Sequence, residues 1–153
     1  MKRIALSLLL GVTLPALADR LPLPADTPAS YPAECGSCHL AYPPALLAGG
    51  DWQRIMAGLD DHFATDAAVD AQKRQEITAF LERHAGNAGK LGNAGDPPRI
   101  STTARFVRKH REVPAKLWHD PRVKSAANCE ACHRGAVDGN YSEHDIAIRE
   151  LKR

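Results

Sequence analysis

All four cysteines of this 153-residue chain belong to two short motifs of the same form, and no other feature constrains the fold as strongly. The motifs are CGSCH at 35–39 and CEACH at 129–133. In a CxxCH motif the two thiols add to the two vinyl groups of a haem, and the adjacent imidazole binds the iron. The sequence therefore predicts two covalently attached c-type haems.

Other uses of four cysteines fit this spacing less well. Two disulfides, a four-cysteine zinc site or a pair of thioredoxin-like redox centres need no histidine after each cysteine pair. Zinc-binding pairs are also normally within about 20 residues of each other, far less than the separation here. We therefore predict that haem is bound by Cys35, Cys38, His39, Cys129, Cys132 and His133.

The first 18 residues have the pattern of a secretory signal peptide. Lys2 and Arg3 form a charged start, residues 4–14 are apolar, and Ala16-Leu17-Ala18 is a small-x-small cleavage site. An uncleaved membrane anchor is the alternative, but the apolar run is shorter than the ~20 residues that a span needs. We expect residues 1–18 to be removed and the mature protein, beginning at Asp19, to be periplasmic.

The composition is that of a soluble globular protein, with 44% hydrophobic and 25% charged residues. The chain has 20 basic and 18 acidic residues, and two of the basic ones lie in the predicted signal peptide. The mature chain is therefore balanced in charge, which argues against a nucleic-acid binder. Only two Trp, three Tyr and three Phe are present, so haem is expected to supply part of the apolar core.

Hydrophobic periodicity predicts a mainly α fold. The proline-rich stretch 19–34 predicts an extended lead-in. One helix is expected from an Asp51 cap to His62, another from about Asp70 to His84, and a third from Ser101 or Thr102 to Val113, before Pro114. A short turn of helix should hold Leu117 and Trp118, and the tail after Ser142 should be a short strand or irregular.

The glycines and prolines of 86–98 predict a linker between an N-terminal haem domain at 19–85 and a C-terminal haem domain at 99–153. Each is expected to be a small cytochrome c-like helical domain built around one haem. Residues 19–85 hold five basic and ten acidic residues, whereas 96–153 hold twelve and eight. The basic run at 99–124 fits a solvated face that offsets haem propionates, a docking patch, or both.

Each iron also needs a second axial ligand. The mature chain has one methionine, Met56, which cannot serve two haems, and five further histidines: His62, His84, His110, His119 and His144. His62 and His110 lie on predicted apolar helix faces, which would bring their imidazoles to haem. His84 is a rival on similar grounds, although a histidine at a helix C-terminus also interacts favourably with the helix dipole. His119 and His144 are predicted to be surface residues.

Four segments carry a resemblance to a known family. They are YPAECGSCHLAYPPALL at 31–47, DWQRIMAGLDDHF at 51–63, RFVRKHREVPAKLW at 105–118 and VKSAANCEACHRGAVDGNYSEHDI at 123–146. With them the sequence resembles the periplasmic dihaem cytochrome c proteins, DHC. The resemblance implies electron transfer through bis-histidine haems, a small oxygen-binding monohaem cytochrome as partner, and a membrane b-type cytochrome as electron source.

Carried over by position, the resemblance implies His39 and His133 as proximal ligands and His62 and His110 as distal ligands. With histidine on both sides of each iron, no position is open to a substrate, and the predicted function is a non-enzymatic electron relay. Without methionine ligation both haems should have low potentials. The alternative is a dihaem peroxidase or haem-based ligand sensor in which one distal histidine leaves or is absent.

Overall fold

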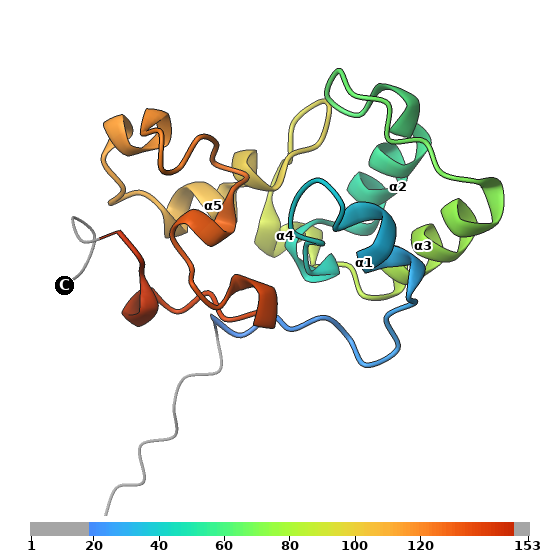
Figure 1. Cartoon of the computed structure of the whole chain (residues 1–153), viewed down its shortest axis with the longest axis horizontal. Helices are drawn as coiled ribbons and strands as arrows, with labels where there is room; N and C mark the ends of the chain where they lie inside the picture. The colour runs from blue at the N-terminus through green and yellow to red at the C-terminus, as the bar shows by residue number, and fades with distance from the viewer. Residues whose placement is uncertain (1–18, 149–153) are drawn as a thin grey trace, which may run out of the picture.

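The computed structural model describes residues 19–148, and this part of the chain is built from short helices without a strand (Figure 1). The α-helices are α1 (Ser30–Cys35), α2 (Gly49–Ala57), α3 (Ala71–Arg83), α4 (Ala88–Leu91) and α5 (Ala104–Lys109). Short 3-10 helices lie at Pro44–Leu46, Leu59–Asp61, Ile100–Thr102, Ala115–His119, Cys129–Ala131, Ala136–Asp138 and Glu143–Asp145. The predicted mainly α fold is confirmed. The predicted signal peptide and residues 149–153 lie outside the described residues.

Two hydrophobic clusters of unequal size form the core. The larger one lies in the half of the molecule that contains α1 to α4 (Figure 1), and its buried members are Tyr31, Leu47, Trp52, Met56, Ile77, Phe80, Leu81 and Ala94. The smaller one lies in the orange and red half and consists of Leu117, Val123 and Ile148. The C-terminal half thus has little apolar core of its own.

Helix α3 follows the prediction closely. The Asp70 carboxylate accepts a hydrogen bond from the Lys73 backbone N–H and so caps the first turn. Ile77, Phe80 and Leu81 are buried on the face that packs against α2 and α1. The helix ends at Arg83 with His84 as its C-cap, ahead of Gly86. A side-chain cap and an apolar stripe, both local in sequence, are sufficient to define this element.

Helix α2 differs from the prediction at both ends. It begins at Gly49, so Asp51 lies in the first turn instead of at the cap, and it ends at Ala57. Gly58 is unfavourable in a helix by about 1 kcal/mol, and acidic residues are unfavourable near a helix C-terminus. His62 therefore lies beyond the 3-10 turn Leu59–Asp61 and not on the same helical stripe as Trp52.

Two further boundaries were predicted wrongly. The lead-in includes a turn closed by the Thr27 N–H and the Pro24 carbonyl, and its last part is helical because α1 starts at Ser30; Pro32 lies in the first turn of α1, where a missing N–H is tolerated. Helix α5 is capped by Thr103, whose hydroxyl accepts from the Phe106 N–H, and it ends at Lys109 with His110 as the C-cap. The extended conformation that Pro114 favours in the residue before it opposes a continuation to Val113.

Part of the predicted linker is folded. Asn87 caps α4 by accepting a hydrogen bond from the Lys90 N–H, Leu91 is buried, and Ala94 belongs to the larger cluster. The boundaries of the two haem domains stay predictions.

The start of the described chain is tied to the C-terminal half. Leu21 N–H donates to the Gly139 carbonyl at 2.7 Å, and Tyr141 N–H donates to the Asp19 carbonyl at 2.9 Å. The blue segment accordingly meets the red one in Figure 1. Among residues 19–148, none of the helices combines the length and the apolar character needed to cross a membrane.

Candidate haem-binding sites

The first CxxCH motif lies on the turn where α1 ends. Cys35 is the last residue of α1, and Cys38 and His39 follow on an exposed turn. The His39 Nδ1 lies 2.7 Å from the Leu40 carbonyl oxygen, to which it donates a hydrogen bond. Because a carbonyl only accepts, the proton of the neutral ring is on Nδ1, and Nε2 is left for iron.

His62 faces His39 from the other side of this site. The centres of the two rings are 6.2 Å apart and their planes are 31° apart. His62 is presented by a tight loop in which Phe63 and Ala64 have φ of 54° and 68°, and the Arg99 guanidinium lies 4.0 Å from the centre of the Phe63 ring.

The second motif is paired with the end of α5. The ring centres of His133 and His110 are 6.0 Å apart, with an interplanar angle of 87°. The His110 Nδ1 donates to the Phe106 carbonyl at 2.8 Å, and its ring stacks on the Phe106 ring at 3.9 Å. His110, like His39, therefore has its Nε2 available.

A cavity of about 810 Å³ opens between these residues, within the size range of cofactor sites. Cys129, Cys132, His133 and His110 all line it. Arg105, Arg108 and Arg111, from the basic run, line it as well, next to acidic side chains such as Glu143. Guanidinium groups of this kind can offset the negative charge of haem propionates.

The separations of the two histidine pairs suit one metal ion between each pair. A bond between a metal ion and an imidazole nitrogen is about 2 Å long, and the nitrogen is ~1.1 Å from the ring centre, so two opposed imidazoles have centres about 6 Å apart. The observed values of 6.2 Å and 6.0 Å agree with this figure. Both sites fit a haem iron with an imidazole on each face.

Burial favours the neutral, metal-binding form of three of these histidines, His62, His110 and His133. Burial lowers the pKa of His133 to about 4 from an ordinary 6.5, and burial also lowers the pKa of His62 and of His110. The Nδ1 of His133 is buried and has no hydrogen-bond partner among the described residues. A buried polar atom of this kind marks a site that is incomplete as it stands.

The cysteines do not have the character of a redox centre. None of the four is in a disulfide, and burial raises the pKa of the Cys35 and Cys129 thiols to about 11. A reactive CxxC centre has a lowered thiol pKa. Within residues 19–148, no group of three or more histidine, cysteine or acidic side chains could hold a metal ion by itself.

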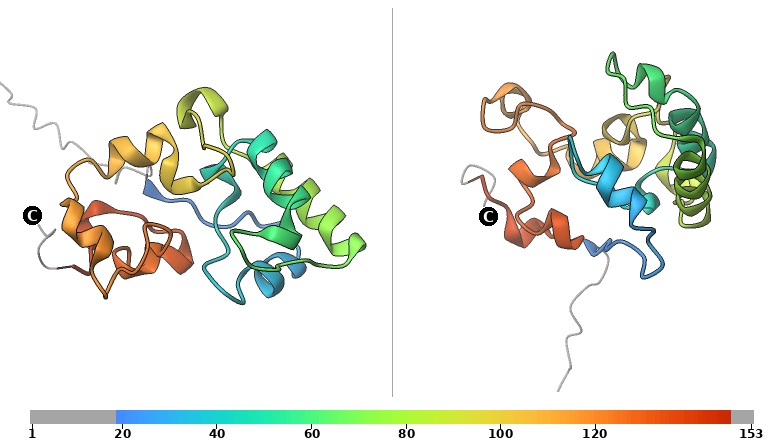
Figure 2. Two further views of the ribbon diagram at one scale, coloured as in Figure 1. Left: turned by 90° about the horizontal axis from the view of Figure 1, so that it is seen from above. Right: turned by 45° about the vertical axis from the view of Figure 1, so that its right-hand side comes forward.

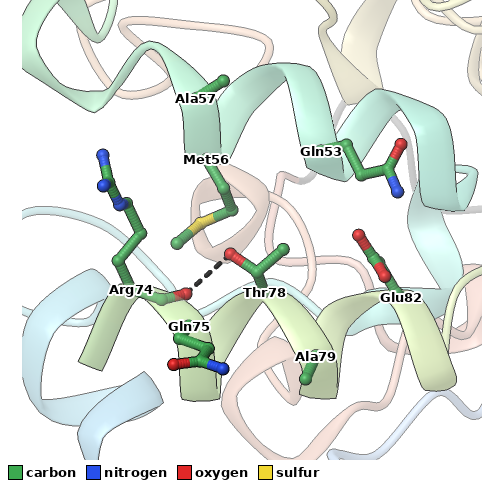
Figure 3. Close-up of a pocket in the computed structure, with 8 residues that line it drawn as sticks. All are labelled: Gln53, Met56, Ala57, Arg74, Gln75, Thr78, Ala79 and Glu82. Atoms are coloured by element: carbon green, nitrogen blue, oxygen red, sulfur yellow. Dashed lines mark hydrogen bonds between the residues drawn. The ribbon is translucent and has the colours of Figure 1, made fainter. Parts of the chain in front are cut away.

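The remaining candidate ligands have other surroundings. The His84 Nε2 is bonded to the Asp26 carboxylate, at 2.8 Å and 3.0 Å from its two oxygens. His119 and His144 are exposed, as predicted, although His144 also lies on the wall of the cavity beside the second motif. Met56 is buried, and its side chain points from α2 toward Thr78 on α3, at a hollow that no histidine or cysteine lines (Figure 3).

Sequence reasoning did not identify the two tyrosines that pack on the motif histidines. The Tyr42 ring stacks on His39, Tyr141 contacts the edge of His133, and Trp118 packs beside His110. The only local signal was the position of Tyr42, three residues after the first motif. The contacts of Trp118 with His110 and of Tyr141 with His133 each span eight residues without a continuous helix between them, so helical periodicity does not predict them.

Comparison with known proteins identifies the architecture. The model of the dihaem cytochrome c family matches residues 31–141, which include both motifs. The diheme cytochrome type c sb-DHC of Shewanella baltica is 37% identical, with a TM-score of 0.70 over 82% of this chain and 95% of that one. No curated protein matches the sequence.

Two structures from Rhodobacter sphaeroides are similar as well. DHC purified from that organism is 37% identical, with a TM-score of 0.65 over 74% of this chain and 96% of its own. A structure described as diheme cytochrome c is 36% identical, with a TM-score of 0.67 over 75% and 97% of the two chains. The predicted cofactor, two covalently attached c-type haems, is confirmed by this family match. The chain belongs to the dihaem cytochrome c family.

Proposed function

We propose that this protein is an electron relay in which each haem iron is held between two histidines, His39 with His62 and His133 with His110. The observation that carries the proposal is the separation of about 6 Å between the ring centres in both pairs. When bound, each haem supplies an iron that takes up and releases one electron.

The residues around each iron position it and limit access to it. The carbonyls of Leu40 and Phe106 fix the orientation of His39 and His110 through their Nδ1 hydrogen bonds. With imidazoles on both faces there is no open coordination position for a substrate, so the protein acts as a carrier and not as an enzyme. Imidazole ligation, without methionine, gives both haems low potentials.

The setting that we propose is the periplasm, reached through the signal peptide at 1–18. A membrane b-type cytochrome is the proposed electron donor, and a small oxygen-binding monohaem cytochrome is the proposed acceptor. Both partners rest on the family membership of the chain.

Low-temperature electron paramagnetic resonance (EPR) of the oxidised holoprotein tests the proposal, because it counts low-spin and high-spin irons. We expect two low-spin signals of equal weight, no near-infrared sulfur-to-iron charge-transfer band, and poor binding of carbon monoxide after reduction. One high-spin iron that binds carbon monoxide readily at neutral pH would instead support the peroxidase or ligand-sensor alternative.

A further inference from the structure

The two haem sites are joined by a single tyrosine that contacts both. Tyr42 lies just after the first motif, and its ring stacks on the His39 ring with centres 4.8 Å apart and planes 18° apart. Its hydroxyl donates to the Ala127 carbonyl at 2.7 Å, across 85 residues of sequence. In the right-hand view of Figure 2, the chain after α1 accordingly comes up against the orange segment of the C-terminal half.

The Ala127 carbonyl is in turn part of the second site. It accepts the Cys129 backbone N–H at 3.0 Å and lies 3.7 Å from the Cys129 Sγ. The loop before this motif is held by the Asn128 side chain, which donates to the Val123 carbonyl at 3.1 Å. One stacking contact and one phenol hydrogen bond therefore connect a predicted ligand of the first iron to a haem-attachment residue of the second.

The tyrosine is itself held in place. Tyr31, buried in the larger cluster, donates its hydroxyl to the backbone carbonyl of Tyr42. Burial raises the pKa of Tyr42 to about 12, so its phenol is a protonated donor at neutral pH. Tyr141 also packs on a motif histidine, but its hydroxyl makes no hydrogen bond among the described residues.

From these contacts we infer that Tyr42 is a positioning residue that couples the two haems, holding the His39 side of one site against the Cys129 side of the other. The inference rests on the proposed relay function. Electrons tunnel more readily through bonds and hydrogen bonds than across gaps, so this connection favours exchange between the haems. In that exchange one electron leaves a ferrous iron and reaches a ferric iron; no bond forms or breaks, and Tyr42 keeps its proton.

The test is the rate of electron exchange between the haems in the holoprotein with the Tyr42→Phe substitution. This change keeps the stacked ring and removes only the hydrogen bond to Ala127. Tyr141→Phe is the matched control, because it removes a phenol hydroxyl beside a motif histidine that makes no hydrogen bond among the described residues, and so leaves the connection through Tyr42 intact.

Electrons can be injected by a laser flash, one per molecule, and followed by freeze-quench EPR. The ring planes differ by 31° in one pair and 87° in the other, and nearly parallel and perpendicular imidazoles give different low-spin ferric signals, so the oxidised iron can be identified. We expect exchange to be severalfold slower in Tyr42→Phe than in the wild type, while Tyr141→Phe exchanges at the wild-type rate and both variants keep two low-spin irons.

Equal rates in Tyr42→Phe and the wild type would overturn the coupling role, as would an equal slowing in both variants. Failure of the relay function itself has a different signature, because the wild-type protein would then show a high-spin iron before any electron is injected.

Discussion

At the residue scale, the histidines of the chain differ in which ring nitrogen is already engaged. His39 and His110 use Nδ1 in hydrogen bonds to carbonyls and keep Nε2 available, whereas His84 uses Nε2 in its contact with Asp26. A histidine whose Nε2 is bonded to a carboxylate has its usual metal-binding atom occupied. The free Nε2 therefore distinguishes His110 from His84, which the sequence alone left as competing candidates for a distal iron ligand.

Substitution of the candidate distal ligands tests that separation. We expect His62→Ala and His110→Ala each to convert one haem to a high-spin form that binds carbon monoxide, because each removes an imidazole about 6 Å from a motif histidine. His84→Asn should leave both haem spectra unchanged and cost at most about 1 kcal/mol, as for an exposed ion pair. The measurement is EPR with carbon monoxide titration, and a high-spin iron in His84→Asn alone would make His84 the ligand.

The lowered pKa of the buried histidines predicts loss of stability in acid. Burial lowers the pKa of His62 and of His110, and an iron bond would also keep both imidazoles unprotonated in the folded holoprotein; as the pH falls from 6.5, the ordinary value, toward pH 4.5, the unfolded chain therefore binds protons there that the folded chain does not. Stability is therefore complete above pH 6.5 and decreases as the pH falls through this window. We expect the guanidinium midpoint of the holoprotein, followed at the Soret band, to fall steadily from pH 7 to pH 4.5.

An aspartate variant provides the control for this titration. Hydrogen bonds from the Arg122 side chain and backbone lower the pKa of Asp120 to about 2. The contribution of this carboxylate to the stability of the folded protein is therefore lost only below about pH 4. The guanidinium midpoint of the Asp120→Asn variant should accordingly still fall between pH 7 and pH 4.5, as it does in the wild type. A midpoint that is constant or rises across that range would contradict the assignment to buried neutral histidines.

At the scale of elements, the sequence predicted those parts of the fold whose causes are local. Helix α3 has its cap and its apolar stripe within 15 residues, and the CxxCH motifs are contiguous because their chemistry requires it. The position of His62 depends on where α2 ends and on a loop with two non-glycine residues at positive φ. The contact from Tyr42 to Ala127 crosses 85 residues, and no local pattern predicts such a contact.

The turn that ties the chain start to the C-terminal half depends on one glycine. Gly139 has a φ of +70°, and a Cβ there would overlap the backbone of Pro22. We expect Gly139→Ala to lower the free energy of unfolding by about 2 kcal/mol or more, because left-handed backbone costs ~1–2 kcal/mol for an L side chain and the overlap must also be relieved. Chemical unfolding measures the effect.

Gly50→Ala is the matched control for this prediction. Gly50 lies in α2, and a Cβ added there meets no atom within 4 Å. Alanine is more favourable than glycine inside a helix by roughly 0.5–1 kcal/mol, so this variant should be slightly stabilised. The argument about Gly139 fails if the two substitutions have effects of the same sign.

At the scale of the whole molecule, the two halves differ in how much of their core is protein. Eight buried residues form the cluster of the half with α1 to α4, but only Leu117, Val123 and Ile148 form the cluster of the other half. A fully buried large apolar side chain contributes about 1.5–3 kcal/mol, so three of them offset only a small part of the entropy lost on ordering that half. The cavity of about 810 Å³ beside the second motif shows where haem adds the missing apolar surface.

Removal of one haem at a time should therefore affect the two halves unequally. With Cys129→Ser and Cys132→Ser together, we expect the C-terminal half to be cleaved rapidly by protease within 104–148, while the fragment that contains α1 to α4 keeps its haem and remains protected. With Cys35→Ser and Cys38→Ser together, α2 and α3 should keep a substantial part of their protection, because Met56, Ile77 and Phe80 pack there without haem. Limited proteolysis with mass spectrometry of the fragments measures both effects, and equal protection of the two halves in both variants would show that the small cluster is sufficient to fold its half without haem.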